Sequence, residues 1–206
     1  SITLPSSLTS IGNYAFQYCS GLTEVDLSNC ISLTSIKSYA FYNCSGLTSI
    51  TLPSSLTNIG WSAFYYCSGL TEVDLSNCTS LTSIGEQTFY NCSGLTELDL
   101  SNCTSLTSIG DDAFADCSGL TELDLSNCTN LTSIGSQAFS GCSGFTSITL
   151  PSSLTSIGVR AFSGCSGLTE VDLSNCTSLI SIRERAFSNC SGLTELDLSN
   201  CTSLTS

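Results

Sequence analysis

A single unit of 23 to 25 residues repeats along the whole chain of 206 residues. A Phe that follows Ala, or once Thr, marks the same point in every copy. It recurs at steps of 25 residues, with two steps of 23, at Phe16, Phe41, Phe64, Phe89, Phe114, Phe139, Phe162 and Phe187. A unit this short cannot bury a core of its own, so it gains stability only by stacking on its neighbours. The period therefore predicts a solenoid.

Each unit contains a leucine pattern that predicts a half-buried strand. In the segment LTELDL at 95–100, Leu98 and Leu100 are expected to point inward, whereas Glu97 and Asp99 point to solvent. A period of about 20–29 residues with the pattern LxxLxL is typical of leucine-rich repeats, in which every unit adds one strand to a curved parallel sheet.

The rest of the unit predicts a second extended side and a compact return. Residues 106–109 (LTSI) read as extended, and residues 111–116 read as a helical turn that brings Phe114 and Cys117 to one side. We expect Gly119 to supply a permissive φ where the chain leaves that turn. The predicted fold is an α/β solenoid: a leucine-rich repeat with a curved parallel β-sheet, short helical turns on the opposite side, and eight repeats of 23–25 residues.

We expect one solenoid domain over residues 1–206. Neither end carries a polar cap of the kind that solenoids need for solubility. Two interpretations follow from the open ends: a fragment of a longer protein, or a unit that stacks end to end.

Two segments carry a resemblance to a known family. Residues 59–67 (IGWSAFYYC) and residues 145–151 (FTSITLP) resemble the IGxxAFxxC and LxxVxLP segments of the BspA-like leucine-rich repeat family. The resemblance implies a surface or secreted protein of a bacterium or microbial eukaryote that takes part in adhesion and binds host proteins. The LSNCTS form departs from that pattern, because it adds the cysteine turn of cysteine-containing leucine-rich repeats.

The fourteen cysteines form two columns that share the repeat phase. One column follows the Phe, as at Cys92 and Cys117, and the other follows the strand, as at Cys103. Zinc sites usually need close cysteine pairs, which these spacings do not supply. Parallel side-chain vectors within a column also make disulfide geometry poor. Free thiols that fill the core are the favoured interpretation, with some disulfides as the alternative.

Twelve of the 17 acidic residues fall on outward strand positions. They are Glu24, Asp26, Glu72, Asp74, Glu97, Asp99, Glu122, Asp124, Glu170, Asp172, Glu195 and Asp197. Like charges about 5 Å apart repel by about 0.8 kcal/mol even in water. The face is either a solvated, aggregation-resistant surface or a site for Ca²⁺ or a basic partner. The candidate cation ladder is Glu72, Asp74, Glu97, Asp99, Glu122 and Asp124, and on that reading millimolar Ca²⁺ raises the melting temperature.

Variation between the copies concentrates in the turn around the Phe. All seven Tyr and the one Trp lie there, in the first four copies. The candidate partner-binding residues are Tyr14, Tyr39, Tyr42, Trp61, Tyr65, Tyr66 and Tyr90. An exposed aromatic patch is typical of contact with a protein, a sugar or a second copy of the chain. The alternative is that these rings only cover the turns.

Nine Asn-x-Ser/Thr sequons arise largely from duplication of the NCS and NCT segments. The candidates for glycosylation are Asn77, Asn102, Asn127, Asn130 and Asn175.

Composition excludes several classes of function. The net charge of −13 disfavours nucleic acid, because such binding depends on Lys and Arg. No apolar run is long enough for membrane insertion. The chain has no His and no phosphate-binding loop, so we expect neither an enzyme nor a cofactor apart from Ca²⁺. The favoured function is an extracellular or cell-surface scaffold that binds a protein or glycan. The alternatives are a subunit that stacks into a filament and, because threonines also form columns, an ice-binding face.

Overall fold

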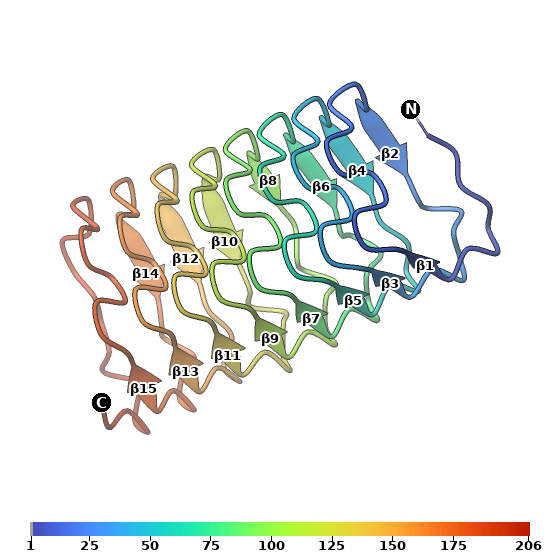
Figure 1. Cartoon of the computed structure of the whole chain (residues 1–206). Helices are drawn as coiled ribbons and strands as arrows, with labels where there is room; N and C mark the ends of the chain where they lie inside the picture. The colour runs from blue at the N-terminus through green and yellow to red at the C-terminus, as the bar shows by residue number, and fades with distance from the viewer. Residues whose placement is uncertain (1) are drawn as a thin grey trace.

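In the computed structural model, residues 2–206 are described and form a parallel β-solenoid whose coils stack along one axis (Figure 1). The segment Leu-Thr-Ser-Ile, which reads Leu-Thr-Asn-Ile at 56–59 and Leu-Ile-Ser-Ile at 179–182, supplies one row of short strands. These strands pair in sequence order in one continuous parallel sheet. They are β1 (Ser10–Ile11), β3 (Ser35–Ile36), β5 (Asn58–Ile59), β7 (Ser83–Ile84), β9 (Ser108–Ile109), β11 (Ser133–Ile134), β13 (Ser156–Ile157) and β15 (Ser181–Ile182).

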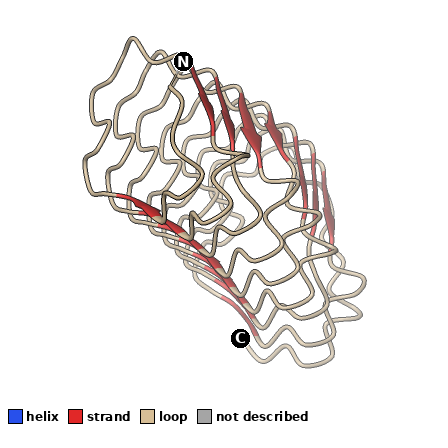
Figure 2. Ribbon diagram, turned by 90° about the vertical axis from the view of Figure 1, so that its right-hand side faces the viewer, coloured by secondary structure: helices blue, strands red, loops and turns tan. Residues whose placement is uncertain are grey.

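The leucine pattern supplies a second row of strands on another side of the coil (Figure 2). This row is divided into a four-stranded and a three-stranded parallel sheet. The first contains β2 (Glu24–Asp26), β4 (Ser49–Thr51), β6 (Glu72–Asp74) and β8 (Glu97–Leu98). The second contains β10 (Glu122–Asp124), β12 (Ser147–Thr149) and β14 (Glu170–Asp172). The predicted alternation is confirmed, since Leu98 and Leu100 are buried while Glu97 and Asp99 are exposed.

One apolar core runs the length of the solenoid. The marker Phe of each coil stacks on the Phe of the next, with ring centroids 5.1 Å apart for Phe89 and Phe114 and 5.2 Å apart for Phe114 and Phe139. Both rings of the first pair are completely buried. Each coil thus buries its Phe only through contact with its neighbours, which is the physical reason for the solenoid.

The predicted helical turns are wrong, because no α-helix occurs among residues 2–206. The segment around each Phe is a series of β-turns, and the residues two before and two after the Phe have positive φ, as at Gln87 (54°) and Asn91 (55°). Backbone N–H groups in this segment alternate between two partners. Phe89 N donates to Ala113 O of the next coil at 2.7 Å, whereas Tyr90 N donates to Gln87 O within its own coil at 3.2 Å. A helix would direct every N–H along its own axis, so bonding between coils replaces it.

The glycine that ends each turn has a different role from the one expected. Gly119 does not have positive φ. A Cβ at this position would lie 2.7 Å from Leu95 O and 2.9 Å from Ser93 O of the preceding coil. The close approach of two backbones, rather than a left-handed conformation, therefore requires Gly here.

All fourteen cysteines are free, and all except Cys19 are buried. In the column that follows the Phe, each buried thiol donates to the Phe carbonyl of the preceding coil, as Cys117 Sγ does to Phe89 O at 3.1 Å. The second column makes longer contacts, such as Cys103 Sγ to Leu75 O at 3.9 Å. Cysteine therefore fills core space and supplies a weak donor that an aliphatic side chain lacks.

Truncation of a central Phe should be costly. Phe114→Ala removes a ring that stacks on both sides, and we expect the free energy of unfolding to fall by about 3–5 kcal/mol in urea denaturation. Phe16→Ala is the matched control, because Phe16 is only partly buried and stacks on one side. Equal losses for the two variants would contradict the dependence on stacking.

The buried thiols should be unreactive. Burial raises the pKa of Cys117 to about 12, so it carries almost no thiolate at pH 8. We expect Ellman's reagent to react rapidly with Cys19 alone in the folded protein. After denaturation without reductant it should count all 14 thiols, and a lower count would reveal disulfides.

Candidate functional site

The aromatic side chains of the first four coils gather along the edge formed by the Phe turns. We call this group the aromatic cluster. It contains Tyr14, Tyr18, Tyr39, Tyr42, Trp61, Tyr65, Tyr66 and Tyr90. Neighbouring rings of the cluster contact one another within and between coils, so the structure brings together all seven predicted residues and adds Tyr18.

Three tyrosines form an inner ladder within the cluster. Tyr42, Tyr65 and Tyr90 stack face to face, with centroids 5.3 Å and 4.8 Å apart. Each is only partly exposed, and burial, followed by the Asp116 carboxylate, raises the pKa of Tyr90 to about 12. Because their faces cover one another, these rings offer a partner edges and hydroxyl groups rather than flat faces.

The remaining rings are much more accessible. Tyr14 is 53 % exposed and Tyr18 is 61 % exposed, while Trp61 and Tyr66 reach 46 % and 40 %. Tyr39 is only partly exposed and stacks on Tyr14, with ring centroids 4.9 Å apart. The exposed rings Tyr14, Tyr18, Trp61 and Tyr66 therefore form an outer surface over the ladder.

Several of these tyrosines occupy unfavourable backbone positions. Tyr18 has φ of 61° and Tyr66 has φ of 59°. The equivalent residues of other coils include Asn43 and Asn91, and Asn tolerates this left-handed conformation better than Tyr. A non-glycine residue there costs about 1–2 kcal/mol. The aromatic residues at these positions thus reduce stability relative to the residues used elsewhere in the same chain.

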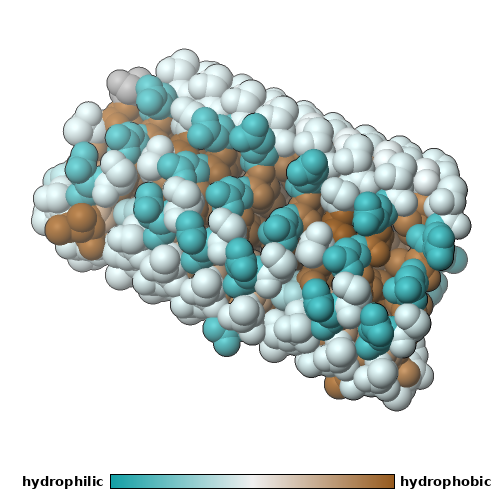
Figure 3. Space-filling model, turned by 180° about the vertical axis from the view of Figure 1, so that it is seen from behind, coloured by the Kyte–Doolittle hydropathy of each residue, from teal (hydrophilic) through white to brown (hydrophobic). Residues whose placement is uncertain are grey.

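The predicted acidic face is present, and we call it the acidic strip: the twelve outward Glu and Asp of the leucine-pattern segments. Figure 3 views this face and shows hydrophilic side chains in rows, with apolar surface visible between them. Two coils interrupt the strip with neutral residues, Ser49 and Thr51 in β4 and Ser147 and Thr149 in β12.

Strand pairing on this face follows the charge of the neighbouring coils. Where an acidic strand meets a neutral one, pairing extends over three residues, as in Glu24↔Ser49 to Asp26↔Thr51. The same holds for the other three junctions of this kind, β4 with β6, β10 with β12, and β12 with β14. Neutral strands therefore coincide with complete ladders.

Pairing is shortened or lost where two acidic coils adjoin. β6 and β8 pair over two residues only, and within residues 2–206 the sheet is interrupted between β8 and β10. The segment that carries Glu195 and Asp197 forms no strand beside β14. Carboxylates on adjacent coils repel by about 0.8 kcal/mol each at 5 Å in water, which opposes closure of the ladder.

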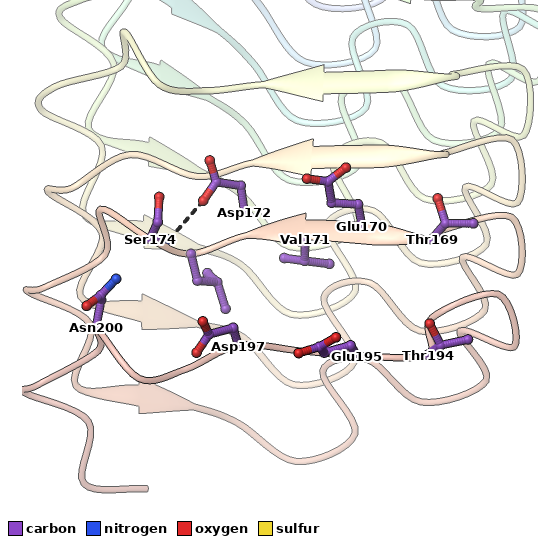
Figure 4. A pocket seen from close by; sticks show the side chains of 10 residues that line it. Thr169, Glu170, Val171, Asp172, Ser174, Thr194, Glu195, Asp197 and Asn200 are labelled. Carbon is purple, nitrogen blue, oxygen red and sulfur yellow. Dashed lines mark hydrogen bonds between the residues drawn. The ribbon is translucent and has the colours of Figure 1, made fainter.

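We call the gap between β8 and β10, and the gap between β14 and the segment of Glu195 and Asp197, the two open junctions. A surface hollow lies at each of them. One, of about 430 Å³, is lined by Glu97, Asp99, Glu122 and Asp124. The other, of about 470 Å³, is lined by the equivalent carboxylates of the last two coils, which form two parallel rows in Figure 4: Glu170, Asp172, Glu195 and Asp197.

Local hydrogen bonds hold several Asp side chains against the turn that follows. Ser101 N donates to Asp99 Oδ1 at 2.9 Å, and Ser174 N donates to Asp172 Oδ1 at 2.9 Å. The hydroxyl and then the backbone N–H of Ser101 lower the pKa of Asp99. These carboxylates are therefore stabilised as anions although they face like charges.

Comparison with known proteins identifies the repeat. The model of the BspA type leucine rich repeat region matches residues 1–121 and 107–206, in six copies. The chain belongs to this family. A leucine-rich repeat protein of T. pallidum is 29 % identical, with a TM-score of 0.69 over 79 % of this chain and 72 % of that one. A leucine-rich repeat protein from Bacteroides ovatus ATCC 8483 is 25 % identical, with a TM-score of 0.46 over 96 % and 69 %. A search of the curated proteins finds no match.

The described part of this BspA-type solenoid contains no preformed metal site. Within residues 2–206, no three acidic or cysteine side chains converge closely enough to hold one metal ion. A Ca²⁺-dependent rise in melting temperature stays a prediction, and it would have to come from ions attracted along the acidic strip.

The five candidate glycosylation residues are all exposed. Two of them are already engaged, because Asn102 Nδ2 donates to Ser76 O and Asn130 Nδ2 donates to Thr104 O, both at 2.8 Å. A glycan at either would place bulk beside a contact between coils, so Asn77, Asn127 and Asn175 are the better candidates.

Two features of the BspA-type solenoid were not predicted as sites. Tyr18 is the most exposed aromatic residue, and its position two after the Phe was the available signal. Arg160 and Arg185 line a hollow on the Phe-turn edge that becomes evident only when coils are stacked.

Among the described residues, no helix long and apolar enough to cross a membrane is found.

Neutralising one open junction should stabilise the protein. Glu122→Ser with Asp124→Thr gives this coil the Ser and Thr that β4 and β12 carry, and removes the repulsion from Glu97 and Asp99. We expect Tm to rise by about 2–4 °C. Added NaCl should raise Tm of the native chain more than Tm of the variant, because salt screens the repulsion.

The matched control is Glu24→Ser with Asp26→Thr, in a coil whose neighbours carry no acidic residues on this face. Both double variants lose an Asp-to-turn hydrogen bond, from Ser28 N or Ser126 N. Stabilisation of the control by as much as the Glu122/Asp124 variant would contradict an origin in repulsion between coils.

Proposed function

We propose that this chain is a non-enzymatic recognition module that binds a protein partner through the aromatic cluster. Proteins of the leucine-rich repeat fold are typically binding scaffolds, and neither the family model nor the similar structures indicate a catalytic family. The observation that carries the proposal is the outer surface of Tyr14, Tyr18, Trp61 and Tyr66. Large exposed rings on one edge are characteristic of protein interfaces.

The backbone conformation supports a role in binding. Tyr18 and Tyr66 have positive φ at positions where other coils carry Asn, Asp or Gly. Aromatic residues there cost stability, and strain of this kind concentrates at functional sites. A role limited to covering the turns would be filled by Asn at lower cost.

The stacking geometry favours a protein over a sugar. Sugars usually pack on the flat face of an aromatic ring, but the ladder rings Tyr42, Tyr65 and Tyr90 cover each other's faces. Two outer rings meet ladder rings at steep angles, Tyr18 with Tyr42 at 86° and Tyr66 with Tyr90 at 63°, which gives an irregular surface suited to side chains. A second copy of the chain is the alternative partner, and this would correspond to the filament interpretation.

A location at the cell surface or outside the cell is part of the same proposal. Its support is membership of the BspA-type family, which the resemblance associates with surface and secreted proteins. The acidic strip would keep such a scaffold from aggregating through that face.

The test uses the triple variant Tyr18→Asn, Trp61→Ser, Tyr66→Asn. Every replacement already stands at the equivalent position of another coil, at Asn43, Ser38 and Asn91. The immobilised native chain should retain partner proteins, and we expect the immobilised variant to retain at least tenfold less of each, as measured by quantitative mass spectrometry. The Tm of the variant should equal or exceed that of the native chain, because Asn relieves backbone strain. Retention of the same proteins by both chains would refute the proposal.

Tyr65→Ser is the control within the ladder. Ser occupies this position at Ser140 and Ser163, but loss of the half-buried Tyr65 ring should lower Tm and leave the outer rings in place. Sedimentation velocity of the native and triple-variant chains separates the alternative partner. Self-association that disappears in the triple variant would identify a second copy, whereas monomers in both cases leave a different protein as the partner.

A further inference from the structure

A polar hollow lies at the opposite end of the Phe-turn edge from the aromatic cluster. It encloses about 440 Å³ and is lined by side chains of three consecutive coils. Arg160 and Arg185 hold the same position, two before the Phe, in neighbouring coils. The backbone hydrogen bond from Arg160 N to Glu184 O, at 3.0 Å, keeps these coils in register.

The hollow is the main concentration of positive charge on an acidic molecule. The chain has four basic residues against 17 acidic ones, and two of the four line this hollow. Among the described residues, the one ion pair within 4.0 Å joins Arg185 Nε to the adjacent, exposed Glu184 at 3.5 Å. Arg160 therefore has no carboxylate to neutralise it, and Arg185 has only a weak, solvent-exposed one.

Hydroxyl and amide donors complete the lining. Ser163 Oγ and Ser188 Oγ lie 2.8 Å apart, so one donates to the other and the acceptor keeps its own proton free for a ligand. Gln137 Nε2 donates to Asp112 Oδ1 at 2.9 Å and has a second N–H, while Asn189 adds a further amide. Asp112 does not line the hollow, and its carboxylate accepts this hydrogen bond from Gln137.

The backbone at these positions does not dictate the choice of Arg. Arg160 has φ of 54° and Arg185 has φ of 58°, while the equivalent Gln87 and Gln137 have φ of 54° and 55°. The column tolerates several side chains, so the backbone does not require Arg. A pair of guanidinium forks from adjacent coils is the arrangement that binds an oxyanion by paired hydrogen bonds.

We propose that this hollow binds a tetrahedral oxyanion, a sulfate or phosphate group carried on a small organic molecule. Arg160 and Arg185 bind the charged oxygens from two coils, and the free serine hydroxyl and the amides donate to the remaining oxygens or to the carrier. The donors approach from three coils, which suits an anion with acceptors in three dimensions. The volume exceeds that of a single oxyanion and leaves room for a sugar-sized carrier.

The test is titration of the native chain with glucose 6-sulfate, glucose 6-phosphate and glucose, at constant ionic strength in chloride, followed by the Arg Nε–Hε signals in NMR. We expect saturable shifts of the Arg160 and Arg185 signals with at least one of the charged sugars and none with glucose. The two charged sugars distinguish a sulfate ester from a phosphate ester as the natural source. Absence of saturable shifts with both would overturn the proposal.

The variants Arg160→Gln and Arg185→Gln use the residue that this column already carries at Gln87 and Gln137. Each should weaken binding by about tenfold, since a charged hydrogen bond is lost. Arg183→Gln is the matched control, because it removes the same charge from the same coil but does not line the hollow. Equal weakening by Arg183→Gln would mean that only overall charge matters, and would also overturn the proposal.

The variant Arg160→Lys distinguishes the contribution of the planar guanidinium donors from that of the positive charge. It keeps the positive charge but loses the planar pair of donors, so we expect weakening close to that of Arg160→Gln. Native affinity in Arg160→Lys would overturn the paired-hydrogen-bond geometry. The anion-binding measurements do not depend on whether the aromatic triple variant loses protein binding, so the two proposals are tested independently.

Discussion

Hydrogen bonding between successive coils is the constraint on which the rest of this structure depends. Backbone N–H groups of each coil donate to carbonyls of a neighbouring coil on three sides. These sides are the row of odd-numbered strands from β1 to β15, which we call the Ser-Ile strands, the leucine-pattern strands, and the Phe turns. The spacing that this bonding imposes also stacks the Phe rings about 5 Å apart and brings each buried Cys thiol to a carbonyl of the preceding coil. Core packing and backbone pairing therefore reinforce one another.

The same spacing turns surface residues into columns, and columns of like charge act against the fold. The Ser-Ile sheet carries no acidic column and stays continuous through all its strands. The leucine-pattern side carries the acidic strip, and it opens between β8 and β10, where Glu97 and Asp99 face Glu122 and Asp124. The neutral strands β4 and β12 restore full pairing on both of their sides. Complete pairing on this side thus coincides with the neutral strands β4 and β12.

The Phe-turn edge combines a fixed backbone with variable side chains. Positive φ recurs two residues before and after each Phe, whatever residue is present. Side chains at these positions project from the edge, so aromatic residues gather in the first coils and arginines in the last, as at Tyr18 and Arg185. A uniform scaffold can in this way present chemically different surfaces at its two ends without any change in its core.

The sequence by itself determined the solenoid, the buried alternation around Leu98 and Leu100, and the phase of the Phe and Cys columns, because these follow from a periodic pattern of apolar residues. It also brought the aromatic residues and the acids to common faces. The turn around Phe114 read as a helix, because its local pattern is compatible with one, and only hydrogen bonding to the next coil decided otherwise. Tertiary structure likewise decided which tyrosines are exposed, where the acidic sheet opens, and that Arg160 and Arg185 share a hollow. These properties depend on distances between residues about 25 positions apart, which the order of residues within one unit does not specify.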